Sequence, residues 1–395
     1  MNDKININEE SEIREELDQG QFYQIWRIMR RNVVPILFAI MCLIGMKLAN
    51  IPVFFLINTI FTRIFRNSFM VLSLIIPVMA GMGLNFGIVL GAMAGQMALV
   101  AVTHLELSGG IGLFVAFIIT TPIALIFGWL AGIILNRAKG REMITSLILG
   151  FFANGLYQLF FLYFVGTIIP MKNEVLMLSN GVGIRNTVDL KAIKYALDRA
   201  FSSLINFNVW LEKGTEAIFG EITFMPYIPL ATFLVIVLLC LALRFFTKTK
   251  IGQEFRSVGQ DNHISRIMGI NVERTRILSV VISTVLAGWG QIIFLQNIGT
   301  LNTYGSHVQV GLFAVAALLI GGASVTRATI GQALLGTVLF HTLFIISPLA
   351  GQALLGDPQV GEYFRVFVAY GVIGISLGLH AWQKQKEIRD KLKAD

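Results

Sequence analysis

The amino-acid sequence predicts an all-α polytopic membrane protein. Hydrophobic residues make up 55% of the 395-residue chain and charged residues only 14%, whereas a soluble chain carries about 25% charged residues to cover its surface. The mean hydropathy is +0.73. Apolar runs of about 20 residues, the length that a helix needs to cross a bilayer, recur along the chain. This composition excludes a soluble enzyme, a nucleic-acid-binding domain, a disordered protein and a secreted disulfide scaffold.

The apolar runs predict about ten transmembrane helices. They lie at 33–50, 70–85, 87–104, 111–136, 143–168, 225–247, 277–298, 309–324, 330–348 and 363–382. The run 51–66 is apolar too, but Arg63 and Arg66 interrupt it, so we interpret it as an interfacial helix. The segment 70–104 is short for two spans and rich in glycine. It predicts short or interrupted helices, which a membrane tolerates only where protein covers the freed backbone groups.

The basic residues orient these spans, because Lys and Arg favour cytoplasmic segments. With ten spans, most of the 31 Lys and Arg residues fall on one side, and both termini lie there too. The predicted organisation is an acidic tail and interfacial helix at 1–32, a transmembrane domain at 33–382 and a cytoplasmic tail at 383–395. The net charge of +8 is therefore a topology signal, and no nucleic-acid partner is expected.

One long segment is predicted on the outer side, at about 169–224. Its apolar residues from Leu190 to Leu204 follow helical spacing. This pattern indicates either an amphipathic helix on the outer membrane surface or a docking surface for a soluble partner.

The longest inner loop is 248–276, and its charges are mixed. Within it, Asn262 to Met268 is predicted to form a short helix that ends at a Gly269 C-cap. This helix would present Arg266 to the cytosol, and we expect a cytosolic partner to bind it.

Few side chains in the predicted spans could do chemistry. His341 is expected to be the only histidine well inside a span, and no acid lies at a span centre, so no proton or sodium relay is evident. The sequence contains no zinc, hydrolase or P-loop motif. Buried amides usually form interhelical hydrogen bonds; among them, the candidates for a solute path are Asn85, Gln96, Asn154 and Gln291. Energy for transport would then come from another chain that acts on the inner loop.

Four segments carry motifs that occur in the same order in one transporter class. In 258–288 the residues that match or nearly match the pattern G-x-N-x-x-A-A-x-x-x-G-I-x-V are Gly259, Asn262, Ser265, Arg266, Gly269, Ile270 and Val272. The segments 318–340, 141–151 and 83–97 are similar to its L-x-G-G-x-S, N-E-V-I-S-T and glycine-rich stretches. The chain thus resembles ABC importer permeases of the branched-chain amino acid, monosaccharide and nucleoside class, and most closely the nucleoside- or simple-sugar-type members.

This resemblance implies a permease subunit that is not an enzyme and has no cofactor of its own. Separate cytosolic ATP-binding subunits would bind ATP and Mg. The residues implied to couple the permease to them are Gly259, Asn262, Ser265, Arg266, Gly269 and Ile270. The other implied partners are a second permease chain, identical or related, an extracytoplasmic substrate-binding protein or lipoprotein, and membrane lipid. The location would be the plasma membrane of a bacterium or archaeon.

The resemblance favours a nucleoside or a simple sugar as the solute and leaves branched-chain amino acids and vitamins open. Gly150 departs from the nucleoside-type segment, where asparagine is usual. The lack of charge inside the predicted spans favours a neutral polar solute. Two other readings are an ion-coupled secondary transporter, which needs a membrane-embedded acid at a broken helix, and a membrane enzyme of lipid or isoprenoid metabolism, which needs an Asp- or His-rich inner motif. We find neither feature in the sequence.

Overall fold

A computed structural model describes residues 32–202 and 229–394, except residues 172, 174, 175 and 180. The helices are α2 (Val33–Ala49), α3 (Val53–Ser73), α4 (Ile75–Met79), α5 (Ile88–His104), α6 (Gly109–Arg137), α7 (Glu142–Leu159), α8 (Ala196–Ser202), α10 (Leu230–Phe246), α11 (Lys250–Gln260), α12 (Asn262–Ile267), α13 (Val272–Ile298), α14 (Ser306–Ile320), α15 (Ile330–Leu355) and α16 (Pro358–Ala394). Two short strands, β1 (Thr187–Asp189) and β2 (Thr300–Asn302), pair antiparallel. The chain is thus an all-α polytopic membrane protein, as predicted.

Within the described residues, five helical stretches are long and apolar enough to cross a membrane. The bent pair α10–α11 would add a sixth, and α2, α5 and α14 are shorter apolar helices. Together with α16, these helices lie where the sequence predicted spans. The second crossing is the exception, because its boundaries differ from the predicted ones.

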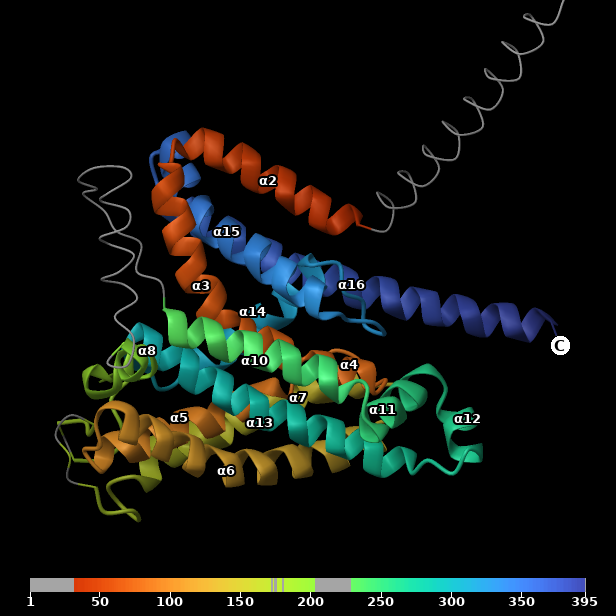
Figure 1. The fold of residues 1–395 in the computed structure, drawn as a ribbon, viewed down its shortest axis with the longest axis horizontal. Coiled ribbons are helices and arrows are strands. Elements are labelled where there is room, and N and C mark those ends of the chain that lie inside the picture. The colour runs from red at the N-terminus through yellow and green to blue at the C-terminus, as the bar shows by residue number, and fades with distance from the viewer. Residues whose placement is uncertain (1–31, 172, 174–175, 180, 203–228, 395) are drawn as a thin grey trace, which may run out of the picture.

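The helices form two groups (Figure 1). In one group α13 packs against α5 and α6, and in the other α15 packs against α2 and α16. Helices α3 and α14 contact members of both groups and join them. Helix α5 is buried on almost every side, which is why its sequence is apolar all round rather than amphipathic.

The second crossing corrects our sequence prediction. One apolar stretch, Phe55–Met79, runs through α3 and α4, where we expected an interfacial helix at 51–66 and a span at 70–85. The prediction was wrong because hydropathy counts Arg63 and Arg66 as interruptions, whereas in the fold both side chains line a cavity between helices. The interruption that we expected within 70–104 is present as a turn between α4 and α5.

The outer segment also differs from its prediction. Residues 190–195 form a turn of 3-10 helix and a loop instead of the start of one amphipathic helix, and α8 begins only at Ala196. Leu190 and Ile193 are buried in the protein core rather than laid on a membrane surface. The remainder of the predicted helix and the rest of 203–228 lie outside the described residues.

Helix α8 is fastened to the start of α10 by Asp198. Its carboxylate accepts hydrogen bonds from the backbone N–H of Thr232 at 3.1 Å and from the Thr232 hydroxyl at 3.0 Å. These bonds satisfy one of the free N–H groups at the start of α10. Burial raises the pKa of Asp198, and the hydrogen bonds from Thr232 act in the opposite direction.

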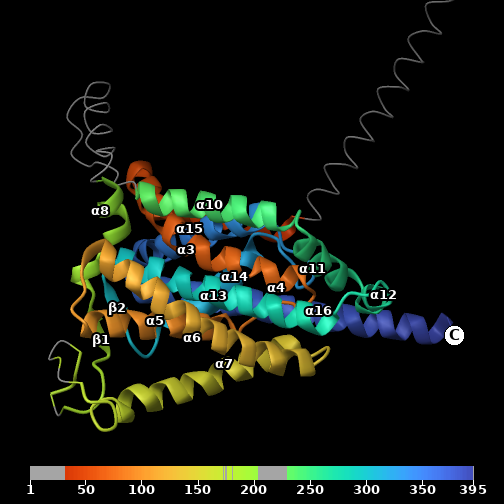
Figure 2. The same cartoon turned by 60° about the horizontal axis from the view of Figure 1, so that its bottom comes forward.

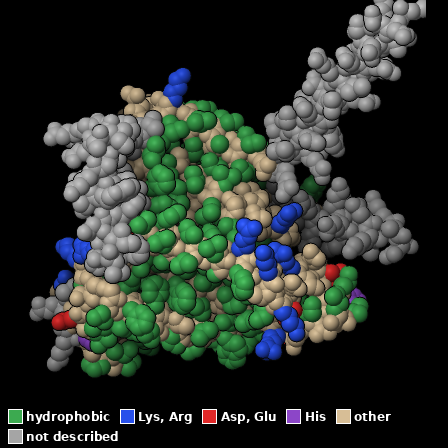
Figure 3. Space-filling view, in the orientation of Figure 1, with side chains coloured by type: hydrophobic (Ala, Val, Ile, Leu, Met, Phe, Trp, Pro, Cys, Tyr) green, Lys and Arg blue, Asp and Glu red, His purple; other side chains and the backbone are tan. Residues whose placement is uncertain are grey.

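The two ends of the molecule are different. Figures 1 and 2 show α8, β1 and β2 at one end, and α11, α12 and the end of α16 at the other. On the face shown in Figure 3, hydrophobic side chains cover the middle, and Lys and Arg gather mainly toward the end that carries α11 and α12. This arrangement agrees with the orientation that the basic residues predict.

Candidate functional site

Helix α11 is a short amphipathic helix that lies against the end of the bundle. The chain bends by 73° between α10 and α11, and the Thr249 hydroxyl caps α11 by accepting the backbone N–H of Gly252 at 3.2 Å. Phe255 is fully buried and stacks edge-on against Phe246 of α10, with 5.4 Å between ring centroids. The apolar face of α11 therefore fixes it to the spans.

Gly259 brings α11 into direct backbone contact with the turn that follows α4. A Cβ atom at this position would lie 2.2 Å from the Met79 carbonyl oxygen and 3.1 Å from the Gly81 nitrogen. No side chain fits in that space. The predicted coupling residue Gly259 is thus a packing residue that seats α11 on the membrane helices.

Helix α12 forms where the sequence predicted it. Asp261 caps its start by accepting two backbone N–H groups of the first turn, at 2.7 and 3.0 Å. Gly269 follows its end with a φ of +81°, and the Ile270 N–H donates to the Ser265 carbonyl at 3.0 Å. Ser265 is buried, and its hydroxyl lies 2.8 Å from that of Ser257 on α11. The predicted helix and its glycine C-cap are confirmed.

The tip of α12 presents apolar side chains to the outside of the protein. Ile264, Ile267 and Met268 are 56%, 75% and 67% exposed, and Asn262 and Arg266 are exposed beside them. The sequence reasoning named Asn262 and Arg266 but missed the three apolar residues. Their periodic spacing on a short helix within a polar loop was the signal that could have identified them.

A buried ion pair links the start of α13 to the start of α7. The Arg276 guanidinium binds the Glu142 carboxylate, and both side chains are largely buried. Arg276 Nε also lies 2.9 Å from Met82 Sδ in the turn before α5. Since α12 leads directly into α13, this pair connects the α11–α12 segment to α7.

A cluster of polar side chains lies toward the other end of α7. His307, at the start of α14, places Nδ1 2.6 Å from Gln96 Oε1 and Nε2 2.7 Å from Asn154 Oδ1. The Tyr157 hydroxyl donates to Gln96 Oε1 at 3.2 Å, and Gln96 Nε2 donates to the Asn302 carbonyl at 3.3 Å. One imidazole ring thus ties α5, α7 and α14 together.

The structure brings two of the four predicted solute-path residues into this cluster, Gln96 and Asn154. Gln291 is buried on α13, and its Nε2 lies 3.5 Å from the Ser306 hydroxyl, next to His307 in sequence. Asn85 lies in the turn before α5, where its Oδ1 accepts the Gly87 N–H at 2.9 Å. It is not part of the cluster.

His307 is the residue that the sequence reasoning missed. We placed its span at 309–324, whereas α14 begins at Ser306 and includes His307 as its second residue. His307 is fully buried. Without the fold, a histidine two residues after the Tyr304–Gly305 turn cannot be distinguished from a residue in a loop.

A polar cavity of about 620 Å³ adjoins the cluster. Its polar lining includes Asn154, Asn302, Ser306 and Gln309, and α13 and α14 supply most of its apolar wall. The cavity is large enough for a small polar solute.

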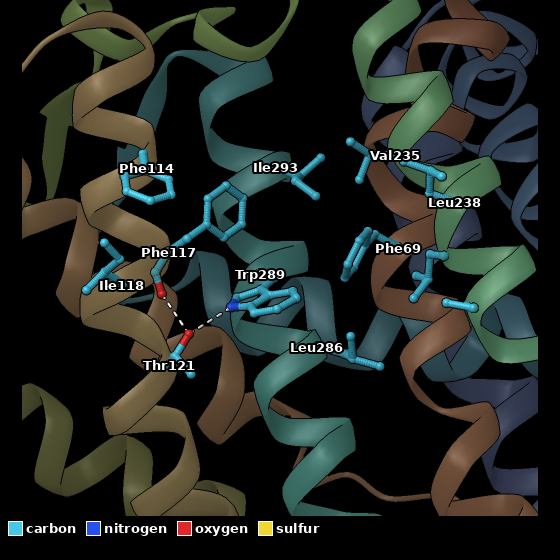
Figure 4. A pocket seen from close by; sticks show the side chains of 12 residues that line it. Phe69, Phe114, Phe117, Ile118, Thr121, Val235, Leu238, Leu286, Trp289 and Ile293 are labelled. Carbon is cyan, nitrogen blue, oxygen red and sulfur yellow. Dashed lines mark hydrogen bonds between the residues drawn. The ribbon is translucent and has the colours of Figure 1, made fainter. Parts of the chain in front are cut away.

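A second cleft, between α6, α10 and α13, is apolar (Figure 4). Aromatic and aliphatic side chains line it, among them Phe69, Phe117 and Leu238. Its hydroxyl-bearing residue, Thr121, already accepts the Trp289 indole N–H at 3.1 Å and donates to the Phe117 carbonyl. This cleft offers nothing to orient a polar solute.

Comparison with known proteins gives consistent matches. The family model of the branched-chain amino acid transport system permease component matches residues 56–376. The fructose import permease FruG of Bifidobacterium longum is 25% identical over 256 residues, which are 64% of this chain and 63% of that protein. The nucleoside permease NupC of Lactococcus lactis is 32% identical over 41% of this chain and 49% of its own length.

The branched-chain amino acid permease LivH of Salmonella typhimurium is 27% identical over 41% of this chain and 57% of its own length. The chain therefore spans less than two thirds of the length of these relatives. No solved structure matches the chain.

Proposed function

Because the chain belongs to the family of branched-chain amino acid transport system permease components, we propose that it is the permease subunit of an ATP-driven importer. It would move a small polar solute into the cell without enzymatic activity of its own. ATP and Mg would be bound by separate cytosolic subunits. A second permease chain and an extracytoplasmic binding protein or lipoprotein would complete the transporter in a bacterial or archaeal plasma membrane.

The observation that carries this proposal is the α11–α12 unit. Its inner face is fixed to the spans through Phe255 and Gly259, and its outer tip presents Ile264, Ile267 and Met268. Exposed apolar side chains bordered by polar ones are typical of a surface that a partner protein covers. An ATP-binding subunit with an apolar groove would bury this tip, and movement of the groove would move α12.

Movement of α12 would reach the polar cluster through α13 and α7. The Arg276–Glu142 pair joins the first turns of these helices. Asn154 and Tyr157 follow Glu142 on α7 by 12 and 15 residues, about 18 and 22 Å along the helix. A tilt of α7 would therefore change how Asn154 meets His307 at the polar cavity.

The solute class is proposed from motifs and relatives together. Nucleosides and simple sugars are the solutes that the sequence motifs favour, and the relatives' names refer to fructose, nucleosides and branched-chain amino acids. An ion-coupled transporter has less support. Such a transporter needs an unpaired acid in its solute path. No acid lines the polar cavity in the described residues, and Glu362, which lines the neighbouring cavity between α3 and α16, is paired with Arg365 and has a side chain that is 43% exposed.

The test is co-purification of the tagged permease with its ATP-binding subunit, compared with the Ile267→Asp variant of the permease. We expect a stable complex for the wild type and at least about tenfold less bound ATPase for the variant, since a buried isoleucine in an interface contributes about 1.5–3 kcal/mol. ATP hydrolysis and solute uptake should fall together.

Ile251→Asp is the matched control, because Ile251 is exposed on α11 away from the α12 tip. This variant should retain the ATPase. Gradient-driven uptake by purified permease with no ATPase present would contradict the proposed function.

A further inference from the structure

A basic cavity lies between α3, α13, α14, α15 and α16. It has a volume of about 330 Å³. Arg63 and Arg66 reach it from α3, His341 from α15, and Glu362 and Arg365 from α16. No sequence motif suggested this site, because its charged residues come from segments about 300 positions apart in the chain.

The basic cavity and the polar cavity adjoin each other. The residues that line both are Phe294, Gln309, Val310 and Phe313. A solute that extended from the polar cavity past these four residues would therefore enter the basic cavity.

The positive charges in the basic cavity exceed the negative ones. Three guanidinium groups, which stay protonated in proteins, face one carboxylate, that of Glu362. Glu362 pairs with Arg365 one helical turn away. Within the described residues, the guanidinium groups of Arg63 and Arg66 form no ion pair, and the Nε atoms of Arg66 and Arg365 are buried without a hydrogen-bond partner.

The surrounding groups offset only part of this charge. The Arg66 and Arg365 guanidiniums lie 5.7 and 4.1 Å from the ring centroids of Phe294 and Phe344, which are modest cation–π contacts. The charges of Arg63 and Arg365 repel each other. Arginines within a membrane span are costly and mark functional sites unless they are paired.

The geometry points to an anion-binding function: the basic cavity binds a carboxylate or phosphate group of the transported solute. Arginine forks match the paired oxygens of both groups. His341 is 7% exposed, has no hydrogen-bond partner among the described residues and lines the same cavity, so its imidazole supplies one further donor. This inference rests on the proposed transport function and narrows its solute class. Nucleosides and simple sugars carry neither group, so the basic cavity favours a solute with an acidic group, such as the carboxylate of an amino acid, over the neutral solute that the sequence favours.

A transported solute and a lipid headgroup could both supply such an anion. Arg66 lies near the middle of the apolar stretch Phe55–Met79, which favours a solute, and binding of a lipid headgroup is an outcome of the test.

Thermal unfolding of the purified full-length chain in neutral detergent tests this site, with sodium phosphate and sodium acetate as probes against sodium chloride at equal ionic strength. We expect phosphate or acetate to raise the unfolding temperature of the wild type, since a ligand that binds only the folded state stabilises it. Arg66→Gln should need about tenfold more of the anion for the same rise, as expected for the loss of one charge-assisted pair. Arg327→Gln, an exposed arginine outside the cavity, should behave as the wild type.

The unfolding temperature without any probe gives a second readout. An anion site predicts that Arg66→Gln is as stable as the wild type or more so, because one of the repelling charges is removed. A purely structural arginine predicts a clear loss of stability and would overturn the inference. No response to either probe would also overturn it, as would a response only to the soluble lipid dihexanoylphosphatidylglycerol. Failure to bind an ATPase would instead contradict the proposed function and leave the anion site intact.

Discussion

The α11–α12 unit and the basic cavity show two ways in which this chain builds a site. The unit is continuous in sequence: Asp261 begins α12, Gly269 ends it, and both act on neighbouring residues. The basic cavity takes its side chains from α3, α15 and α16. The helix of the first site was predicted to within one residue of its end, whereas Arg63 and Arg66 of the second led us to interpret a span as an interfacial helix. Local patterns thus reveal sites that are built from neighbouring residues. A site built from distant segments can appear in the sequence only as charged residues that interrupt an apolar run, as Arg63 and Arg66 do.

The largest expected effect concerns the Arg276–Glu142 ion pair, which joins α13, the helix that follows the α11–α12 unit, to α7. Glu142→Gln leaves the buried Arg276 guanidinium without its carboxylate, and breaking such a pair costs about 3 kcal/mol in the free energy of unfolding. If the pair also transmits movement, ATP hydrolysis by the assembled transporter will continue while uptake is lost. Urea unfolding and the ratio of ATP hydrolysed to solute imported measure the two effects.

The control for this prediction is Glu273→Gln. Glu273 pairs with Lys139 at 3.9 Å, and their side chains are 61% and 59% exposed, so its loss should change stability by no more than about 0.5 kcal/mol. Equal effects of the two variants would show that the α7–α13 pair has no special role.

A smaller effect is expected in the unit itself. Gly259→Ala places a methyl group against the Met79 carbonyl oxygen, and α11 must move away, at a cost of about 2 kcal/mol. Binding of the ATPase should weaken because α12 moves with α11. Gly155→Ala is the matched control, since open space surrounds that position on α7; it should be neutral or slightly stabilising. Intact ATPase binding by Gly259→Ala would show that α12 acts without a fixed support.

The smallest expected change in stability concerns the polar cluster around His307, which lies beside the polar cavity. His307→Leu keeps the bulk of the ring but removes its bonds to Gln96 and Asn154, which should lower the free energy of unfolding by about 1–2 kcal/mol. Uptake should fall because the cluster aligns the polar cavity. His263→Leu, on the exposed face of α12, should leave the unfolding free energy unchanged. A wild-type uptake rate for His307→Leu would remove the cluster from the solute path.

The sequence predictions were accurate where an element depends on residues close together in the chain, and less accurate where it depends on distant ones. The α12 helix was predicted well because caps and glycine C-caps depend on residues within one turn. Gln96 and Asn154 were chosen as polar residues in apolar runs, and the fold joined them. Their partner His307 was missed because it stands at a helix start that hydropathy placed three residues late. Leu190 and Ile193 have helical spacing in the sequence, yet they lie in and beside a 3-10 turn and are buried in the core by tertiary packing.

By itself, the sequence determined that the chain is a helical membrane protein and where the α11–α12 unit lies, and its charge bias predicts which end faces the cytosol. Apolar run length, charge bias and helix caps are local quantities, so they can be read without coordinates. Only the tertiary structure decided that α3 carries Arg63 and Arg66 into a cavity between helices, together with Arg365, and that one histidine joins Gln96 to Asn154. The physical reason is that the cost of a charge in a membrane depends on what surrounds the side chain. Packing supplies those surroundings from distant parts of the chain.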